Sequence, residues 1–480
     1  AFGPAADAAG AGLLLALAAL AVTDPQLPVH PPVGVIRDLY GRLRFAVDAQ
    51  RPRSIAEEED LTEIGPAGRY PDAAHGFLVD AASQLGAYAS SPPVLYRDDL
   101  SRPDALFQNA DWHETLVPEH LDADSITHPA LTIHLLDRQI IGQDWLNTNR
   151  AIRPSGTPPR IVFYGLKGGV GRSTALAMLA YGLAREGKKV LLLDFDLESP
   201  GLSGLLLPAN RVAGFGLVDW FIEDAIDRPE GERQRAQAAL LNDLVTDSPL
   251  GDATDHGRIR IAAAMGQGET AYLAKLARVY ADIPTAQGPE RFAQRMVRLV
   301  ETLEQQEQPD VVLIDSRAGL HDLAAISIAM LADLALLFAT DSEQNWQGYS
   351  QLFQHWQQHP KVCRMVRERL RLVRALFPET DQRLRSERFQ MHAYDLFAQH
   401  LYDIIEPKPE ADGAARTDGD ADLFSFALDD DDAPHSPLTI RWNARFMEFD
   451  PIGQHGRGEM DDTDIDLAFG PFVRAIQSLT

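Results

Sequence analysis

Short apolar runs separated by helix-length segments characterise the middle of the chain. Residues 160–164, 188–194, 310–315 and 334–339 are rich in leucine or β-branched side chains and have the length of buried strands. Between the first two runs, leucine and alanine recur at helical spacing from Ser173 to Arg185. This alternation predicts a doubly wound α/β fold, in which a mostly parallel sheet has helices on both faces.

The pattern before this region is mixed. Val33 to Val47 has the pattern strand, turn, strand, and residues 72–89 have the pattern of a helix. Residues 131–141 again resemble a strand, and no catalytic constellation accompanies them. We therefore expect a smaller α/β or α+β domain of unknown role at the N-terminal end.

Two compositional breaks organise the chain further. Pro154, Pro158 and Pro159 form a linker, which places the N-terminal domain at residues 1–157 and the doubly wound domain at 158–480. Residues 406–437 are rich in Asp, Pro, Gly and Ala, a composition typical of a flexible acidic connector within the second domain.

Charge and cysteine content limit the partners. The chain has 44 basic and 70 acidic residues and a net charge of −26, which argues against nucleic acid as a partner. The single cysteine, Cys363, excludes an internal disulfide and fits a cytoplasmic location. The early apolar run at residues 13–22 has about half the length of a membrane span, so we interpret it as a buried helix and expect no membrane partner.

Candidate chemistry begins at a glycine-rich turn between the first strand and its helix. Residues 167–174 read Lys-Gly-Gly-Val-Gly-Arg-Ser-Thr. Backbone N–H groups of such a turn converge on an anion, and the helix N-terminus adds about half a positive charge. We therefore predict a nucleotide-phosphate site, with the Ser173 hydroxyl offered to Mg²⁺. Its residues are Gly168, Gly169, Val170, Gly171, Arg172, Ser173 and Thr174.

Carboxylates follow the next strands. Asp194 and Asp196 close the second strand, and Asp315 closes the third. Taken alone, each of these aspartates could be a structural residue that caps a strand or a helix. The carboxyl ends of parallel strands meet at one edge of a sheet, however, beside the glycine-rich turn. Together with the glycines, these carboxylates are therefore expected to hold a Mg²⁺ ion and an attacking water.

These motifs resemble those of the ParA/MinD group of P-loop ATPases, within the class that includes signal-recognition GTPases. Residues 167–174 are similar to its deviant Walker A loop, K-G-G-x-G-K-[ST]-T, and residues 194–196 to its D-x-D segment. Residues 311–319 resemble its Walker B strand and second switch. The resemblance extends over about 160–339 and weakly over 438–480. It implies ATP and Mg²⁺ as cofactors, ATP hydrolysis, and a homodimer whose nucleotide state is read by a partner protein.

The resemblance also implies residue roles. Lys167 would reach the nucleotide of the other subunit, and Asp196 would position the attacking water. Asp315 would hold Mg²⁺ through water, and Asp194 would support the metal region. The implied catalytic residues are Lys167, Arg172 and Asp196, the implied metal residues are Ser173, Asp194 and Asp315, and the implied switch residues are Arg317 and Gly319.

Two arginines depart from the family pattern. Arg172 replaces the second loop lysine, and its planar fork has a different reach from a lysine's point charge. We expect it to preserve nucleotide binding and leave the hydrolysis rate open. Arg317 stands where relatives carry proline or a small residue. It is either half of an ion pair or a phosphate contact supplied by the second switch.

The sequence leads us to expect a dimeric switch driven by Mg-ATP, with alternatives. A non-hydrolysing ATP-bound scaffold follows if Arg172 prevents turnover, and a partition-type DNA-binding ATPase remains despite the acidic charge. A ligase or kinase on the same fold is a weaker third. His355 and His359 have a spacing that suits a metal, but no third ligand is evident, so a solvated helix face is the preferred interpretation.

Overall fold

The chain forms two compact units. In the computed structural model, unit 1 comprises residues 1–146 with 355–363, and unit 2 comprises residues 147–354 with 364–480. The structure describes residues 33–38, 42–52, 72–85, 89–109, 112–117, 131–138, 142–226, 229–252, 257–268, 271–285, 288–378, 380–404, 423–446, 449–452 and 462–479. The apolar run at residues 13–22 lies outside them. No helix within these described ranges is long and apolar enough to cross a membrane.

Unit 1 is built on a five-stranded sheet in the order β3-β2-β1-β5-β4. β1 and β2 form the antiparallel hairpin predicted from the sequence, and β1 also pairs with β5 in parallel. Apolar residues of this sheet pack against α2 around Phe45 and Leu78, both buried. The elements are β1 (Val33–Arg37), β2 (Leu43–Val47), α2 (Asp72–Gln84), β3 (Ala89–Tyr96), α3 (Pro103–Phe107), β4 (His113–Val117) and β5 (Leu131–Asp137).

The sequence prediction was wrong at one boundary of this unit. The helix expected over residues 72–89 ends at Gln84, and Ala89 begins β3. Pro92 and Pro93 follow within β3, and proline in a helix interior loses a hydrogen bond and clashes with the preceding turn. The strand expected over 131–141 ends at Asp137, and residues 139–141 lie outside the described part of the chain.

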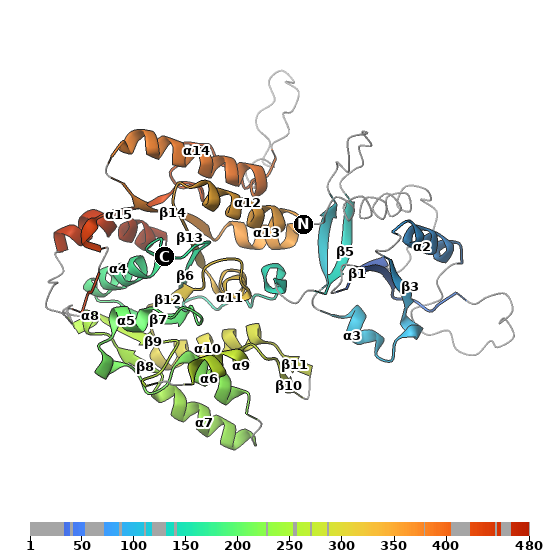
Figure 1. The fold of residues 1–480 in the computed structure, drawn as a ribbon, viewed down its shortest axis with the longest axis horizontal. Helices are drawn as coiled ribbons and strands as arrows, with labels where there is room; N and C mark the ends of the chain where they lie inside the picture. Colours follow the sequence, from blue (N-terminus) through green and yellow to red (C-terminus); the bar gives the residue numbers. More distant parts are fainter. Residues whose placement is uncertain are drawn as a thin grey trace. The chain divides into compact units, whose positions relative to one another are not determined.

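Unit 2 is built on an eight-stranded sheet in the order β15-β14-β13-β6-β12-β7-β9-β8 (Figure 1). Only the β8–β9 pairing is antiparallel, so the predicted doubly wound, mostly parallel fold is confirmed. The strands are β6 (Arg160–Gly165), β7 (Lys189–Phe195), β8 (Val245–Asp247), β9 (Arg258–Ala262), β12 (Val311–Ser316), β13 (Leu334–Ala339), β14 (Leu370–Phe377) and β15 (Leu438–Arg441).

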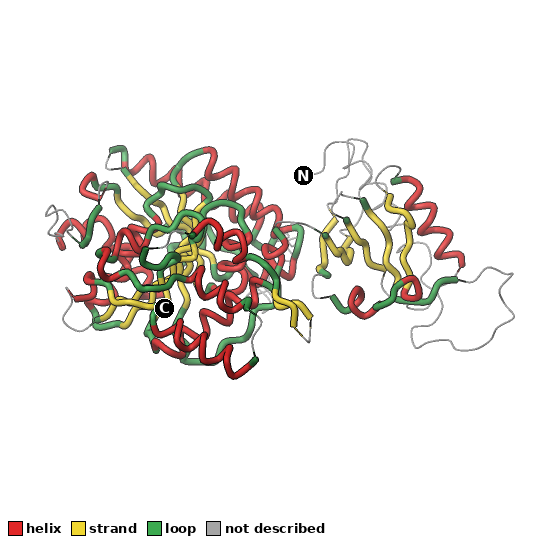
Figure 2. Tube along the Cα trace, turned by 60° about the horizontal axis from the view of Figure 1, so that its bottom comes forward, coloured by secondary structure: helices red, strands yellow, loops and turns green. Residues whose placement is uncertain are grey.

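Helices cover both faces of this sheet, as Figure 2 shows. Because side chains alternate along a strand, Ile161 and Phe163 of β6 face one side, where they pack with α4 and α15. Arg160 faces the other side and binds Glu304 of α10 at 2.7 Å. The larger helices are α4 (Arg172–Arg185), α7 (Glu230–Asn242), α10 (Phe292–Glu307), α12 (Glu343–Gln357), α14 (Gln382–His400) and α15 (Asp462–Leu479).

Short elements complete unit 2. They are α5 (Leu202–Leu206), α6 (Leu217–Asp224), α8 (Pro249–Asp252), α9 (Tyr272–Val279), β10 (Ile283–Thr285), β11 (Gly288–Glu290), α11 (Asp322–Ile326) and α13 (Pro360–Arg367), the last beginning within unit 1.

The segment expected as an acidic connector divides in two. Residues 406–422 lie outside the described part of the chain. Residues 423–437 are described and pack within unit 2. His435 is fully buried and contacts the Tyr402 hydroxyl at 2.5 Å, and the backbone N–H of Phe424 donates to Asp403. Buried contacts therefore anchor the end of this acidic segment.

The direction in which the sheet grows reverses at β6. After β6 the chain builds β7 and β9 on one side, and then β13, β14 and β15 on the other. Such a reversal separates the two flanking connections and opens a crevice at the carboxyl ends of the central strands. The glycine-rich turn follows β6 directly, so it lies at this point.

Candidate functional site

The glycine-rich turn has the backbone geometry of an anion cradle. Gly169 and Gly171 have φ angles of +76° and +77°, in the left-handed region that favours glycine. A Cβ added to Gly168 or Gly169 would meet no atom within 4 Å, so the space above the turn is open. Gly171 caps α4, whose first backbone N–H groups lack partners within the helix. The turn is therefore shaped to receive an anion such as a phosphate.

Arg172 lies inside the site. Its side chain is 9% exposed, and its guanidinium binds two carboxylates. Nε donates to Asp315 and Nη2 to Asp196, both at 2.7 Å, whereas buried Nη1 has no hydrogen-bond partner among the described residues. Burial alone would lower the pKa of this guanidinium, but the charges of Asp315 and Asp196 raise it. Arg172 is therefore a fixed cation with one donor left over.

The remaining predicted metal residues are also hydrogen-bonded within the protein. The Ser173 hydroxyl donates to Asp315 at 2.7 Å. Asp194 is fully buried and accepts the backbone N–H groups of Leu202 and Asp196. Burial and the nearby charge of Asp315 raise the pKa of Asp194 well above its usual value. Burial also raises the pKa of Asp196, against the opposing charge of Arg172.

This arrangement does not fit a divalent metal as it stands. Asp315 has both oxygens occupied, by Arg172 and by Ser173. No group of three or more His, Cys, Asp or Glu residues within the described ranges is arranged to hold a metal ion. Mg²⁺ requires a nearly ideal octahedron of oxygens, and no such set faces an open space here. The residues fit a phosphate, therefore, and do not fit Mg²⁺.

The other predicted loop residues have distinct positions. Lys167 is exposed, and its ammonium donates to the side-chain oxygen of Gln344 in α12. Val170 is buried, and Thr174 is half-buried in the first turn of α4. The structure thus separates the two loop cations, because Lys167 points to α12 and Arg172 points to the carboxylates.

The predicted switch segment contacts the loop region. Arg317 forms an ion pair with Glu198, which also accepts from the Tyr280 hydroxyl. Of the two interpretations of Arg317, the ion pair is the one this structure contains. Gly319 has a φ of +85°, and its N–H donates to Gly165 at the end of β6 at 3.0 Å. Both residues therefore tie this segment to neighbours of the glycine-rich turn.

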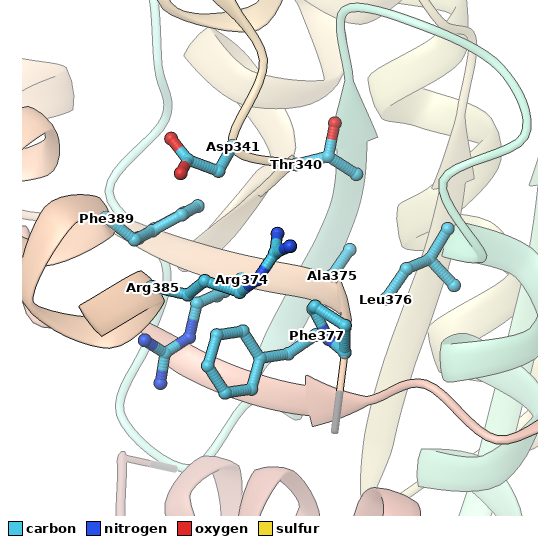
Figure 3. A pocket seen from close by; sticks show the side chains of 9 residues that line it. Thr340, Asp341, Arg374, Ala375, Leu376, Phe377, Arg385 and Phe389 are labelled. Carbon is cyan, nitrogen blue, oxygen red and sulfur yellow. The ribbon is translucent and has the colours of Figure 1, made fainter. Parts of the chain in front are cut away.

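A pocket of about 230 Å³ opens near the same turn, between the ends of β13 and β14 and helix α14 (Figure 3). Asp341 lies on one side and Phe377 on the other. Leu376 lines the pocket, and its Cδ2 would lie 3.5 Å from a Cβ added to Gly171. Arg374 stacks on Phe377, and burial lowers its pKa to about 10. Buried Nε of Arg385 has no hydrogen-bond partner in the described structure.

A family comparison agrees with this geometry. Residues 161–335 match the family model described as the CobQ/CobB/MinD/ParA nucleotide-binding domain. The match covers less than half of the chain, so the similarity concerns this segment and not the whole protein. The match begins in β6 and ends in β13, and so includes the glycine-rich turn, Asp194, Asp196 and Asp315.

Curated relatives match short segments of the chain. The carbon monoxide dehydrogenase accessory protein CooC of Rhodospirillum rubrum is 32% identical over 95 residues, which cover 20% of this chain and 36% of CooC. The septum site-determining protein MinD of Helicobacter pylori is 49% identical over 53 residues, 11% of this chain and 19% of that protein. The chain thus matches well under two thirds of the length of either relative.

Solved structures of the same group superpose loosely. The MinD cell division protein of Aquifex aeolicus has a TM-score of 0.37 at 15% identity, and covers 67% of this chain and 97% of its own. A ParA family ATPase of Chlorobium tepidum has a TM-score of 0.32 at 17% identity, over 49% of this chain and 80% of its own.

Three features of the site have no sequence signal in the motifs. Glu198 and Gln344, which bind Arg317 and Lys167, lie far along the chain from those partners. The pocket beside Leu376 draws on β13, β14 and α14 together. Only the pocket has a local sequence signal outside the motifs. Pro378 follows β14 and lines the pocket, and a proline at this place predicts a loop there.

Proposed function

We propose that this chain is an ATP-binding and ATP-hydrolysing switch. The observation that supports this most directly is Arg172, a buried cation at the start of α4 whose Nη1 has no partner. A buried donor without an acceptor is costly, and a phosphate oxygen above the glycine-rich turn would satisfy it. The family match over residues 161–335 supports a nucleotide as the source of that phosphate.

Different residues of the chain would bind the phosphates, neutralise their charge and orient the attacking water. Backbone N–H groups from Gly168 to Gly171 would hold the phosphates, and Arg172 would neutralise their charge. Asp196 would then be available to accept a hydrogen bond from the attacking water and orient it. Arg317 and Gly319 would report the state of the site, because both lie in the segment after β12, which is hydrogen-bonded through Gly319 to Gly165, the last residue before the loop.

The pocket beside Leu376 is the proposed seat of the nucleoside. Leu376 lies next to Gly171, so a ligand whose phosphates occupy the turn extends naturally toward this pocket. Phe389 offers an aromatic face, and Arg385, whose buried Nε has no hydrogen-bond partner among the described residues, offers a donor to a ring nitrogen or oxygen. The Arg374 guanidinium is held by Thr439, Ser386 and the ring of Phe377, so it shapes this wall of the pocket. Two aromatic residues near the pocket are held by the protein itself: Trp346 donates to Asp341, and buried Tyr349 donates to the Phe338 carbonyl.

One observation favours the non-hydrolysing scaffold as a second candidate. Asp196 is bound to Arg172 at 2.7 Å, and a carboxylate held in this way is poorly placed to orient water. If ATP leaves this ion pair intact, the nucleotide would be a structural ligand. Release of phosphate by the purified chain separates the two candidates.

The proposal is tested by binding of a fluorescent ATP analogue. Arg172→Ala is expected to weaken affinity roughly 10- to 100-fold, the effect of losing one or two charge-assisted hydrogen bonds. Arg185→Ala is the matched control, since Arg185 is an exposed arginine at the other end of the same helix. Equal affinity of the parent and Arg172→Ala would remove the turn as the phosphate site.

A further inference from the structure

We infer that Arg172 occupies the place that a divalent cation would take among the strand-end carboxylates, and that it excludes Mg²⁺ until a nucleotide draws it away. Three carboxylates, Asp194, Asp196 and Asp315, converge at the ends of β7 and β12, and the cation found among them is a guanidinium. The inference deepens the proposed function, but its first measurement needs no nucleotide.

The hydrogen bonds around the carboxylates carry this inference. Five of their six oxygens accept a protein donor, and Asp196 Oδ1 is the exception. The donors are Arg172 Nε and Nη2, the Ser173 hydroxyl, and the backbone N–H groups of Asp196 and Leu202. A metal ion would have to displace Arg172 or Ser173 from Asp315, because those two occupy both of its oxygens.

Charge strengthens the exclusion. An arginine side chain cannot lose its proton in a protein, so it repels a second cation under all working conditions. Arg172 is 9% exposed, and water screens that repulsion poorly at a buried position. Removal of the guanidinium would leave Asp196 and Asp315 without the cation that they share, and two neighbouring carboxylates attract a divalent cation.

Nucleotide supplies the reason for Arg172 to move. Its Nη1 already lacks a partner, and phosphate oxygens above the turn offer several acceptors to a guanidinium, often in bidentate fashion. A shift of Arg172 toward phosphate releases Asp196 and Asp315 in the same movement. Nucleotide arrival and metal entry are thus coupled through one side chain, and the affinity of each for the site depends on the other.

Binding of Mn²⁺ to the nucleotide-free chain, measured by electron paramagnetic resonance, tests this inference. The parent is expected to show no site tighter than about 1 mM, whereas Arg172→Gln is expected to bind at least roughly tenfold more tightly. Adding Asp315→Asn to Arg172→Gln is expected to abolish the gained site. Arg185→Gln serves as the matched control and is expected to behave like the parent.

A second measurement keeps the test decisive if Arg172→Gln folds poorly. The parent alone is titrated with Mn²⁺ before and after saturation with ATP, with free ATP–Mn²⁺ accounted for by a protein-free titration. Tight Mn²⁺ binding by the nucleotide-free parent overturns the inference, whatever the variant does. Failure of ATP to bind would instead contradict the proposed function and leave the nucleotide-free result standing.

Discussion

Each unit contains a strand that ends in an aspartate bound to an arginine, and the two pairs differ in charge balance. In unit 1, Arg37 and Asp137 are direct neighbours on β1 and β5, and Arg37 Nε donates to Asp137 at 2.8 Å. In unit 2, Arg172 comes from the glycine-rich turn and binds Asp315 and Asp196 together, with Asp194 behind them. In unit 1 the arginine is paired with one carboxylate, whereas in unit 2 two carboxylates bind the same guanidinium and a third lies behind them.

The comparison shows how a structural pair differs from a site. A balanced pair between adjacent strands satisfies itself and needs no ligand. An excess of buried carboxylate beside a donor without a partner is costly to the fold, and such cost is characteristic of functional positions. We therefore expect substitutions in the two regions to have opposite consequences for activity and stability.

The largest expected effect is on turnover. Asp196→Ala is expected to bind ATP and to lose hydrolysis by roughly 10²- to 10⁴-fold, because a positioned base or water-orienting group contributes that much to the barrier. Asp137→Ala is the matched control in unit 1 and is expected to leave kcat unchanged. Phosphate release and analogue binding are measured on the same samples, and unchanged turnover in Asp196→Ala would reduce its role to a structural cap.

The matched Asp→Asn changes are expected to shift stability in opposite directions. Asp137→Asn is expected to lower the free energy of unfolding of unit 1 by about 2–3 kcal/mol, since a charged hydrogen-bond partner of Arg37 is lost. Asp194→Asn is expected to raise the stability of unit 2, because ionised Asp194 is disfavoured by burial. Hydrogen exchange, measured in each unit as the temperature is raised, gives the change in stability of that unit for both variants. A destabilised Asp194→Asn would contradict the excess-charge account.

The sequence was sufficient for local features of unit 2 and insufficient for its side-chain partners. The turn, its helix and the strand-ending carboxylates were predicted correctly as elements, because each is written in consecutive residues. The partners of Arg172 were not, since Asp315 lies 143 residues further along the chain and meets it only through the order of β6 and β12. Strand register and side-chain direction decide such contacts.

The histidines of unit 1 illustrate the same limit. The interpretation of His355 and His359 as a solvated helix face was wrong, because His359 is 4% exposed. Its ring lies 4.9 Å from the ring of His113 and 5.2 Å from that of His355. His113 is on β4, which no helical spacing reveals. Burial, together with the neighbouring rings, lowers the pKa of His359 to about 3.

This buried histidine predicts that unit 1 loses stability as pH falls. The folded pKa of His359, about 3, is below the unfolded value of about 6.5, so stability is fully present above pH 6.5 and is lost as pH falls. At pH 5 unit 1 is expected to lose roughly 1–2 kcal/mol. His359→Gln is expected to flatten this dependence. Asp194 acts in the reverse sense, because its raised folded pKa favours the protonated folded state as pH falls. Hydrogen exchange of unit 1 at pH 7 and pH 5 measures this loss, and an unchanged pH dependence in His359→Gln would contradict the assignment.

The smallest expected change in nucleotide affinity belongs to Lys167. This residue is exposed and donates to Gln344, outside the carboxylate cluster that holds Arg172. Lys167→Ala is therefore expected to weaken ATP affinity by less than about fivefold, well below the effect of Arg172→Ala. The proposed role of Lys167 is in assembly, where an exposed ammonium beside the turn is positioned to meet the phosphates of a second copy.

Light scattering tests this role. Asp196→Ala is expected to show a mass that doubles with ATP, and adding Lys167→Ala is expected to prevent the doubling. Lys188→Ala is the matched control, since Lys188 is another exposed lysine of unit 2 and is expected to leave the doubling intact. A dimer that forms without nucleotide would contradict the switch and favour the scaffold, in which Lys167 and Arg172 both serve a permanently bound ATP.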